Sequence, residues 1–173
     1  VVDVPAQNIA RWNGTIWQAL GSGLNDEVAT LANYNGELIA GGAFTVTVGW
    51  GVALNRVARW NGASWQALNL GGNNKLNALG VYGGDLIAGG DFISIGDVLQ
   101  AHGIARWNGV IWQPLGEGLS WEYTGNVQAL TVYEGDLIAG GYCANDADCN
   151  QRKSENQLCR KHYSYKVVFQ RQW

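Results

Sequence analysis

The 173-residue chain has no methionine, only two prolines and no cysteine before residue 143. Its formal net charge of -3 offers none of the basic surface that nucleic-acid binding requires. No apolar run approaches the ~18 residues of a membrane-spanning helix. The start, Val1 to Pro5, lacks the basic flank and apolar core of a signal peptide. We therefore expect no nucleic-acid partner and no membrane span, and the missing methionine indicates a processed product or a fragment.

Glycine and tryptophan are abundant instead, with 25 and 9 copies, and many belong to a segment that occurs three times. The segment begins with Ile-Ala-Arg-Trp-Asn-Gly at residues 9–14, recurs with Val in place of Ile at 57–62, and returns at 104–109. A second tryptophan follows each copy, and each repeat continues to a Leu-Ile-Ala-Gly-Gly string that ends at Gly42, Gly90 or Gly141. A period of 48 and then 47 residues between the leading tryptophans predicts a repeat architecture.

Each repeat predicts four short strands, which in the first full blade cover residues 28–34, 37–44, 56–60 and 64–68. Asn-Gly pairs follow the first and third of these strands, and Asn-Gly between apolar runs is a strong hairpin signal. Two hairpins make a four-stranded antiparallel sheet, which must bury its apolar faces against neighbouring units. The sequence therefore predicts an all-β fold of about three β-propeller-type blades.

The connections between these strands are of two kinds. The Asn-Gly turns are tight, whereas residues 45–55, 69–75, 93–103 and 116–126 form long connections that differ between units. Because alternate connections of an up-and-down sheet lie at the same end, all the long connections should share one end. A variable recognition surface is expected there.

Residues 9–142 resemble the kelch family of propeller blades, in which a strand ends in Gly-Gly and tryptophans follow at fixed spacing. More narrowly, they resemble a kelch-like repeat of large secreted or surface bacterial proteins, with a related form in fungal cortical-marker proteins. The resemblance implies a propeller at the cell surface or outside the cell. Because kelch-like propellers serve many tasks, it does not choose a function.

The composition changes after residue 142. Residues 1–142 hold five basic and eleven acidic side chains, whereas 143–173 hold six basic and three acidic ones, all three cysteines and no glycine. We interpret 1–142 as the propeller repeats and 143–173 as a divergent tail, either a degenerate closing hairpin or foreign sequence. One disulfide among Cys143, Cys149 and Cys159 would leave one thiol free, and the spacing does not choose among the three pairings.

Recurring side chains are expected to be structural. The tryptophans of every unit should fill the space between blades, and Arg11, Arg59 and Arg106 should pair with recurring acids such as Glu37, Asp85 and Asp136. Residues without a counterpart in other units are the better binding candidates. These lie in the long connections: Trp50, His102, Trp121 and Tyr123. The last two could equally cap the third blade.

The repeats offer no set of catalytic residues. Asp91 and Asp97 lack a second carboxylate at glycosidase spacing, and His102 stands alone in the repeats. The run from Asp146 lacks the glycine and glutamate of a calcium loop, and the cysteine spacings do not match a zinc site. We expect no enzyme, no metal and no cofactor, and we favour a binding or scaffold module with a protein or glycan partner. A glycan-binding propeller is the alternative, and a propeller hydrolase or oxidase fragment is a more distant one.

Ring closure is the remaining question, because propellers typically need four to eight blades. The first hairpin, residues 9–20, supplies outer strands only, and residues 127–142 supply inner strands only. Two copies joined head to tail would form six blades in a two-fold ring. We therefore expect a homo-oligomer or a fragment of a larger propeller.

Overall fold

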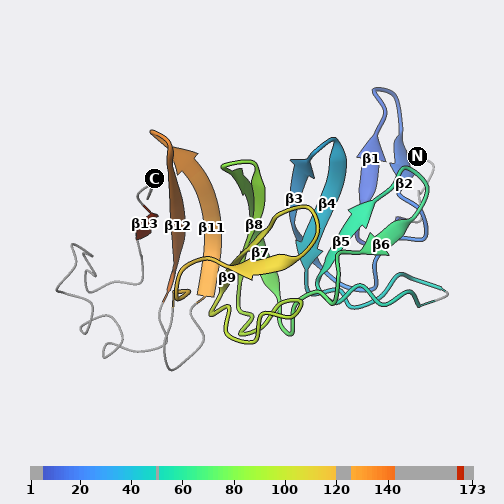
Figure 1. The fold of residues 1–173 in the computed structure, drawn as a ribbon. Helices are drawn as coiled ribbons and strands as arrows, with labels where there is room; N and C mark the ends of the chain where they lie inside the picture. Colours follow the sequence, from blue (N-terminus) through green and yellow to red (C-terminus); the bar gives the residue numbers. More distant parts are fainter. Residues whose placement is uncertain (1–5, 50, 120–125, 143–166, 170–173) are drawn as a thin grey trace.

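The computed structural model describes residues 6–49, 51–119, 126–142 and 167–169. Every regular element in these residues is a β-strand, which confirms the predicted all-β class (Figure 1). The strands are β1 (Ala10–Trp12), β2 (Trp17–Ala19), β3 (Val28–Tyr34), β4 (Glu37–Gly42), β5 (Val57–Trp60), β6 (Trp65–Ala67), β7 (Leu76–Tyr82), β8 (Asp85–Gly90), β9 (Ile104–Trp107), β10 (Trp112–Pro114), β11 (Asn126–Tyr133), β12 (Asp136–Tyr142) and β13 (Val167–Phe169). None of the described residues belongs to a helix, so that part of the chain contains no helix able to cross a membrane.

The strands form four antiparallel sheets. Two are complete, with the orders β3-β4-β5-β6 and β7-β8-β9-β10. The first hairpin, β1-β2, is a two-stranded sheet, and β11-β12-β13 is a three-stranded one. Asn35 and Gly36 have φ of 52° and 82°, as the tight turn between β3 and β4 requires. The predicted four-stranded unit is therefore present twice in full.

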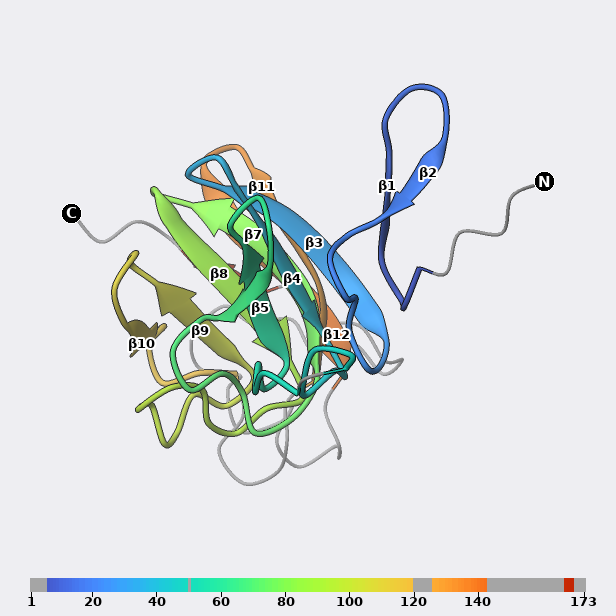
Figure 2. The ribbon, with the colours of Figure 1, turned by 90° about the vertical axis from the view of Figure 1, so that its right-hand side faces the viewer.

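The sheets lie side by side like blades, with their first strands in contact. β7 contacts β3 on one side and β11 on the other. The β1-β2 hairpin stands at one end of the row, and the β11-β12-β13 sheet stands at the other (Figure 1). The view in Figure 2 runs along the row and shows the hairpin apart from the stacked sheets. The arrangement is propeller-like, and the described residues do not close a ring.

The Gly-Gly pair that ends the second strand of each complete sheet is a point of close contact. A Cβ on Gly42 would lie 2.1 Å from the Glu27 carbonyl oxygen, and one on Gly90 would lie 2.2 Å from that of Lys75. The first strand bulges beside each pair, between Val28 and Thr30 in the first complete sheet. Only glycine fits there, as the sequence pattern predicted.

The core consists of apolar clusters between successive sheets. The cluster between the two complete sheets includes Val57 and Leu68 from one sheet and Leu79, Trp107 and Trp112 from the next. A second cluster joins the first hairpin to the sheet that follows it, and a third joins β8 and β9 to β11 and β12. Stability therefore depends on contact between neighbouring sheets.

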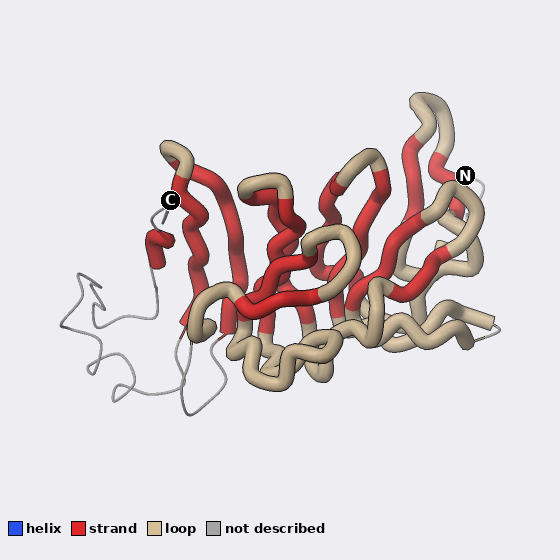
Figure 3. The backbone as a smooth tube through the Cα atoms, viewed as in Figure 1, coloured by secondary structure: helices blue, strands red, loops and turns tan. Residues whose placement is uncertain are grey.

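Tight turns and long connections lie at opposite ends of the sheets. Figure 3 shows the long connections gathered along the lower side, away from the turns that join β3 to β4, β7 to β8 and β11 to β12. We call this side the loop end. Its described parts are residues 20–27, 43–49, 51–56, 68–75, 91–103 and 115–119.

One strand comes from the divergent tail. β13 pairs with β12, opposing Phe169 to Leu137 and Val167 to Ala139. It takes the third position of its sheet, the one that β5 and β9 hold in the complete sheets. Residues 143–166 and 170–173 lie outside the described part, so both interpretations of the tail stay predictions.

Candidate functional site

The recurring tryptophans link each sheet to the one before it. The Trp65 indole N–H donates to the Leu20 carbonyl, and the Trp112 N–H donates to the Leu68 carbonyl, each at 3.1 Å. Both indoles are almost fully buried. Trp65 and Trp112 therefore fill the space between blades, as their recurrence predicted. The same prediction is wrong for Trp12 and Trp17, which are 53% and 56% exposed because the first hairpin has no sheet packed on that face among the described residues.

The recurring arginines are also engaged within the blades. The Arg59 guanidinium lies 3.6 Å from the Glu37 carboxylate, and Arg106 lies 3.4 Å from Asp85. Each pair joins the third strand of a complete sheet to the start of its second strand. The predicted arginine–carboxylate pairing is therefore confirmed in these two sheets.

The predicted binding residues are only partly accessible to structural description. Trp50, Trp121 and Tyr123 lie outside the described residues, and their proposed role stays a prediction. His102 is half-buried at the loop end. Its φ is 45°, and its carbonyl accepts the Leu119 N–H at 3.0 Å.

His102 has a structural counterpart in Asn55, although the two residue types differ. Asn55 stands five residues before its sheet's leading tryptophan, as His102 does, and has φ of 50°. The Asn55 carbonyl likewise accepts an N–H from the next inter-sheet connection, that of Gly72 at 2.8 Å. The position therefore has a backbone role in fastening two long connections, whatever its side chain contacts.

Two asparagines that the sequence analysis did not single out organise the loop end. The Asn25 side-chain oxygen accepts the N–H groups of Thr45 and Val46 at 2.8 and 3.1 Å. Asn73 does the same for Ile93 and Ser94, both at 3.0 Å. Each clamps the connection that enters a sheet to the long connection within that sheet. The signal was an asparagine two residues after a glycine, in Gly23 to Asn25 and Gly71 to Asn73.

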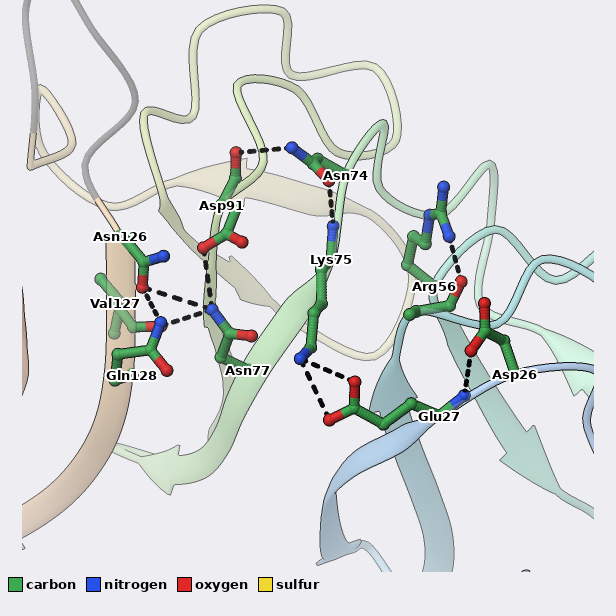
Figure 4. A network of polar contacts seen from close by, with 11 residues as sticks. Asp26, Glu27, Arg56, Asn74, Lys75, Asn77, Asp91, Asn126, Val127 and Gln128 are labelled. Atoms are coloured by element: carbon green, nitrogen blue, oxygen red, sulfur yellow. Dashed lines mark hydrogen bonds and ion pairs between the residues drawn. The ribbon is translucent and has the colours of Figure 1, made fainter. Parts of the chain in front are cut away.

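A row of polar side chains crosses the loop end where the first strands of the sheets begin (Figure 4). The Lys75 ammonium contacts both carboxylate oxygens of Glu27 at 3.0 and 2.8 Å, and so bridges two neighbouring sheets. The Glu27 side chain is more than half exposed, so the pair remains open to solvent. Such a pair can exchange its contacts for those of a polar ligand.

The row continues toward the third sheet through Asn77. Its amide donates to the Asp91 carboxylate at 2.9 Å, to the Val127 carbonyl at 3.3 Å and to the Asn126 side-chain oxygen at 3.4 Å. Gln128 also contacts Asn126. We call these side chains the polar row: Glu27, Lys75, Asn77, Asp91, Asn126 and Gln128. Its members differ at equivalent positions of the repeats, since Ala29, Asn77 and Gln128 each precede the leucine of their strand by two residues.

Exposed apolar side chains also lie on the long connections of the loop end. Val52, Leu70, Ile93 and Leu99 are all exposed large hydrophobic residues, and Leu99 is 78% exposed. A mixed surface of amides, charges and separate apolar groups is typical of a binding surface.

The charged side chains of the polar row are engaged in hydrogen bonds and ion pairs. The carboxylate of Glu27 faces a lysine, and that of Asp91 faces an amide. Within the described ranges, no group of three or more His, Cys, Asp or Glu side chains is placed to hold a metal ion.

A scan against protein-family models finds no match for this chain, and neither does a search of curated proteins.

Proposed function

We propose that this chain is a non-catalytic binding or scaffold module built from kelch-like propeller blades, and that it belongs to a secreted or cell-surface protein. One observation carries the proposal. In the two complete sheets the recurring tryptophans and arginines are used between and within blades, whereas the long connections that differ between repeats lie at the loop end. A constant framework with a variable end is the usual division in modules that recognise partners.

The framework holds the loop end in place. The Asn25 and Asn73 clamps connect loops within a sheet, and the Asn55 and His102 carbonyls connect loops of successive sheets. A surface fixed in this way loses less conformational entropy when it binds a partner. Its rigidity favours recognition over a purely spacer role.

A glycan is the second ligand class that the polar row supports. Asn77, Asn126 and Gln128 carry amides that both donate and accept, and Asp91 adds a carboxylate. These are the side-chain groups that hydrogen-bond sugar hydroxyls. The exposed apolar residues of the loop end equally suit a protein partner, so ligand class is left to experiment.

The test compares the two ends of the blades in the 173-residue protein. Leu99 and Val110 are 78% and 74% exposed, on a long connection and on a tight turn respectively. Leu99→Asp and Val110→Asp are therefore matched changes at opposite ends. Each variant is applied, beside the unchanged chain, to a defined glycan array and to a phage-displayed random peptide library.

We expect glycans or peptides whose binding is lost in Leu99→Asp and kept in Val110→Asp. Loss of glycan binding in Asn77→Ala would identify the polar row as the sugar contact. Binding that depends on Val110 alone, or no ligand from either probe, would contradict the proposal. Turnover of a polysaccharide by the pure protein would contradict its non-catalytic character.

A further inference from the structure

The β1-β2 hairpin has the same construction as the outer strands of the complete sheets. Its tryptophan rings, Trp12 and Trp17, lie 5.6 Å apart at 53°, and those of Trp107 and Trp112 lie 5.4 Å apart at 54°. Yet Trp17 is 56% exposed, whereas its equivalent Trp112 is 3% exposed. The hairpin is preformed but its aromatic face is uncovered in this structure.

The missing neighbour of the hairpin can be identified from strand register. Residues 38–40 of β4 pair with 58–60 of β5, and residues 86–88 of β8 pair with 105–107 of β9. By the same repeat alignment, residues 10–12 of β1 belong beside 137–139 of β12. The edge of β1 that faces away from β2 has no strand partner among the described residues. The edge of β12 that faces away from β11 holds only the three pairs with β13.

The arginine and the carboxylate of a third ion pair are also separated, one on the hairpin and one on β12. In the complete sheets Arg59 meets Glu37, and Arg106 meets Asp85. Arg11 on β1 instead donates from Nε to Gln18 at 3.0 Å. The carboxylate of Asp136, at the Glu37 and Asp85 position of β12, has no ion-pair or hydrogen-bond partner within the described ranges. Arg11 and Asp136 are the two halves of a third such pair.

The inter-sheet hydrogen bonds are divided too. The Trp112 indole N–H donates to the Leu68 carbonyl. By the repeat alignment, the equivalent donor is the Trp17 indole N–H and the equivalent acceptor is the Leu115 carbonyl. Trp17 has no acceptor in the described part of the chain, and Leu115 ends the outer strand of the sheet next to β11-β12. A hairpin added to β12 would bring its Trp17 to the Leu115 carbonyl.

One chain cannot join these halves in the present arrangement, because the hairpin and β12 stand at opposite ends of the row (Figure 1). We propose that two copies exchange their β1-β2 hairpins, each adding its hairpin to β12 of the other in place of β13. The product is a two-fold ring of six blades, four from within the chains and two shared. The proposal deepens the function proposed above and rests on its propeller blades.

Ring closure also covers an exposed leucine. Within the chain, Leu79 of β7 packs against Gly41, and Leu130 of β11 packs against Gly89. In each case the leucine Cδ1 lies 3.4 Å from the position of a Cβ added to the glycine. Leu31 is the equivalent side chain on β3, and it is 52% exposed. In the ring, Leu31 of each copy packs at the equivalent glycine, Gly140, of the other.

Charge exchange tests this arrangement on the full chain. Arg11→Asp and Asp136→Arg each place like charges together at both shared blades of a homodimer. An equimolar mixture of the two variants restores opposite charges at both shared blades, because each chain supplies what the other lacks. Asp97→Arg, at an exposed loop-end residue, makes the same charge change as Asp136→Arg away from the exchange. Far-UV circular dichroism checks that every variant is folded.

Sedimentation equilibrium should give twice the mass of one chain for the unchanged protein and for Asp97→Arg. We expect each single variant to raise the dimer dissociation constant at least about tenfold, and the mixture to recover the loss. A monomer at micromolar concentration, a dimer indifferent to both variants, a mixture that does not recover or an open polymer would overturn the exchange. A monomer that still binds a ligand at the loop end would overturn it and leave the proposed function standing.

Discussion

The close contact between β8 and β11 predicts a large penalty for adding one methyl group at Gly89. An ideal Cβ there would lie 2.4 Å from Cγ1 and 3.0 Å from Cβ of Val127 on the neighbouring sheet. Carbon atoms pack best at about 3.5–4.0 Å, so β11 would have to move by about 1 Å. Valine is stiff at χ1 and Val127 is buried, so rotation does not relieve the contact. We expect Gly89→Ala to lower the free energy of unfolding by about 2 kcal/mol.

Gly80 provides the matched control. It lies on β7 at the same inter-sheet boundary, and its added Cβ would meet only Leu130 Cβ, at 3.6 Å, which is an ordinary contact. Neither glycine has positive φ. Gly80→Ala should therefore be neutral or stabilise the protein by about 0.4–1 kcal/mol, because alanine reduces the entropy of the unfolded chain.

Urea denaturation followed by tryptophan fluorescence measures both changes. Adding Val127→Ala to Gly89→Ala removes Cγ1, so the double variant should be more stable than the sum of the two single effects. If Gly89→Ala costs no more than Gly80→Ala, or if the double variant shows no coupling, the close packing of β8 on β11 is not what limits this position.

Three further outcomes follow from the described contacts. Trp112→Phe should cost about 1–3 kcal/mol, since it removes a buried indole hydrogen bond, whereas Trp17→Phe should cost under about 0.5 kcal/mol in the monomeric form; thermal unfolding compares the two. Asn73→Ala should increase amide hydrogen exchange at the two N–H groups that it holds, with global stability lowered by about 1–2 kcal/mol, and unchanged exchange there would refute the clamp. Lys75→Gln should cost at most about 1 kcal/mol because its pair with Glu27 is solvent-exposed, and a cost that does not shrink in high salt would show that the ion pair is not its source.

The blade could be predicted from the sequence because local and repeated signals agree in it. The Asn35-Gly36 turn, the Gly41-Gly42 pair and the paired tryptophans each have a geometry that only one arrangement satisfies. The predicted strand 37–44 ends at Gly42 in the structure, where Gly42 pairs with Val28 of β3 and donates its N–H to the Arg56 carbonyl. Repetition therefore located the strands to within a residue or two.

The loop end was less accessible to the same reasoning. Asn25 and Asn73 act through acceptor bonds to backbone groups about twenty residues away, and the glycine that stands two residues before each asparagine does not show where those groups lie. His102 seemed singular because its equivalent is an asparagine, and only backbone angles show that the two match. The exposure of Trp17 could not be predicted from the sequence either, because the burial of a repeated residue depends on whether a neighbouring sheet packs against it.

The Trp65 and Trp112 indoles each donate a hydrogen bond to the sheet before their own, and this direction determines how repeats can be added to the chain. The sequence repeat begins with the outer strands of one sheet and ends with the inner strands of the next. Duplicating one 47-residue unit between Leu68 and Leu115 would therefore insert a whole sheet and leave both terminal surfaces chemically unchanged. Adding a sheet therefore leaves the chemistry of the two ends unchanged. The number of sheets in a closed ring is then limited by the angle between neighbouring sheets rather than by recognition between the ends.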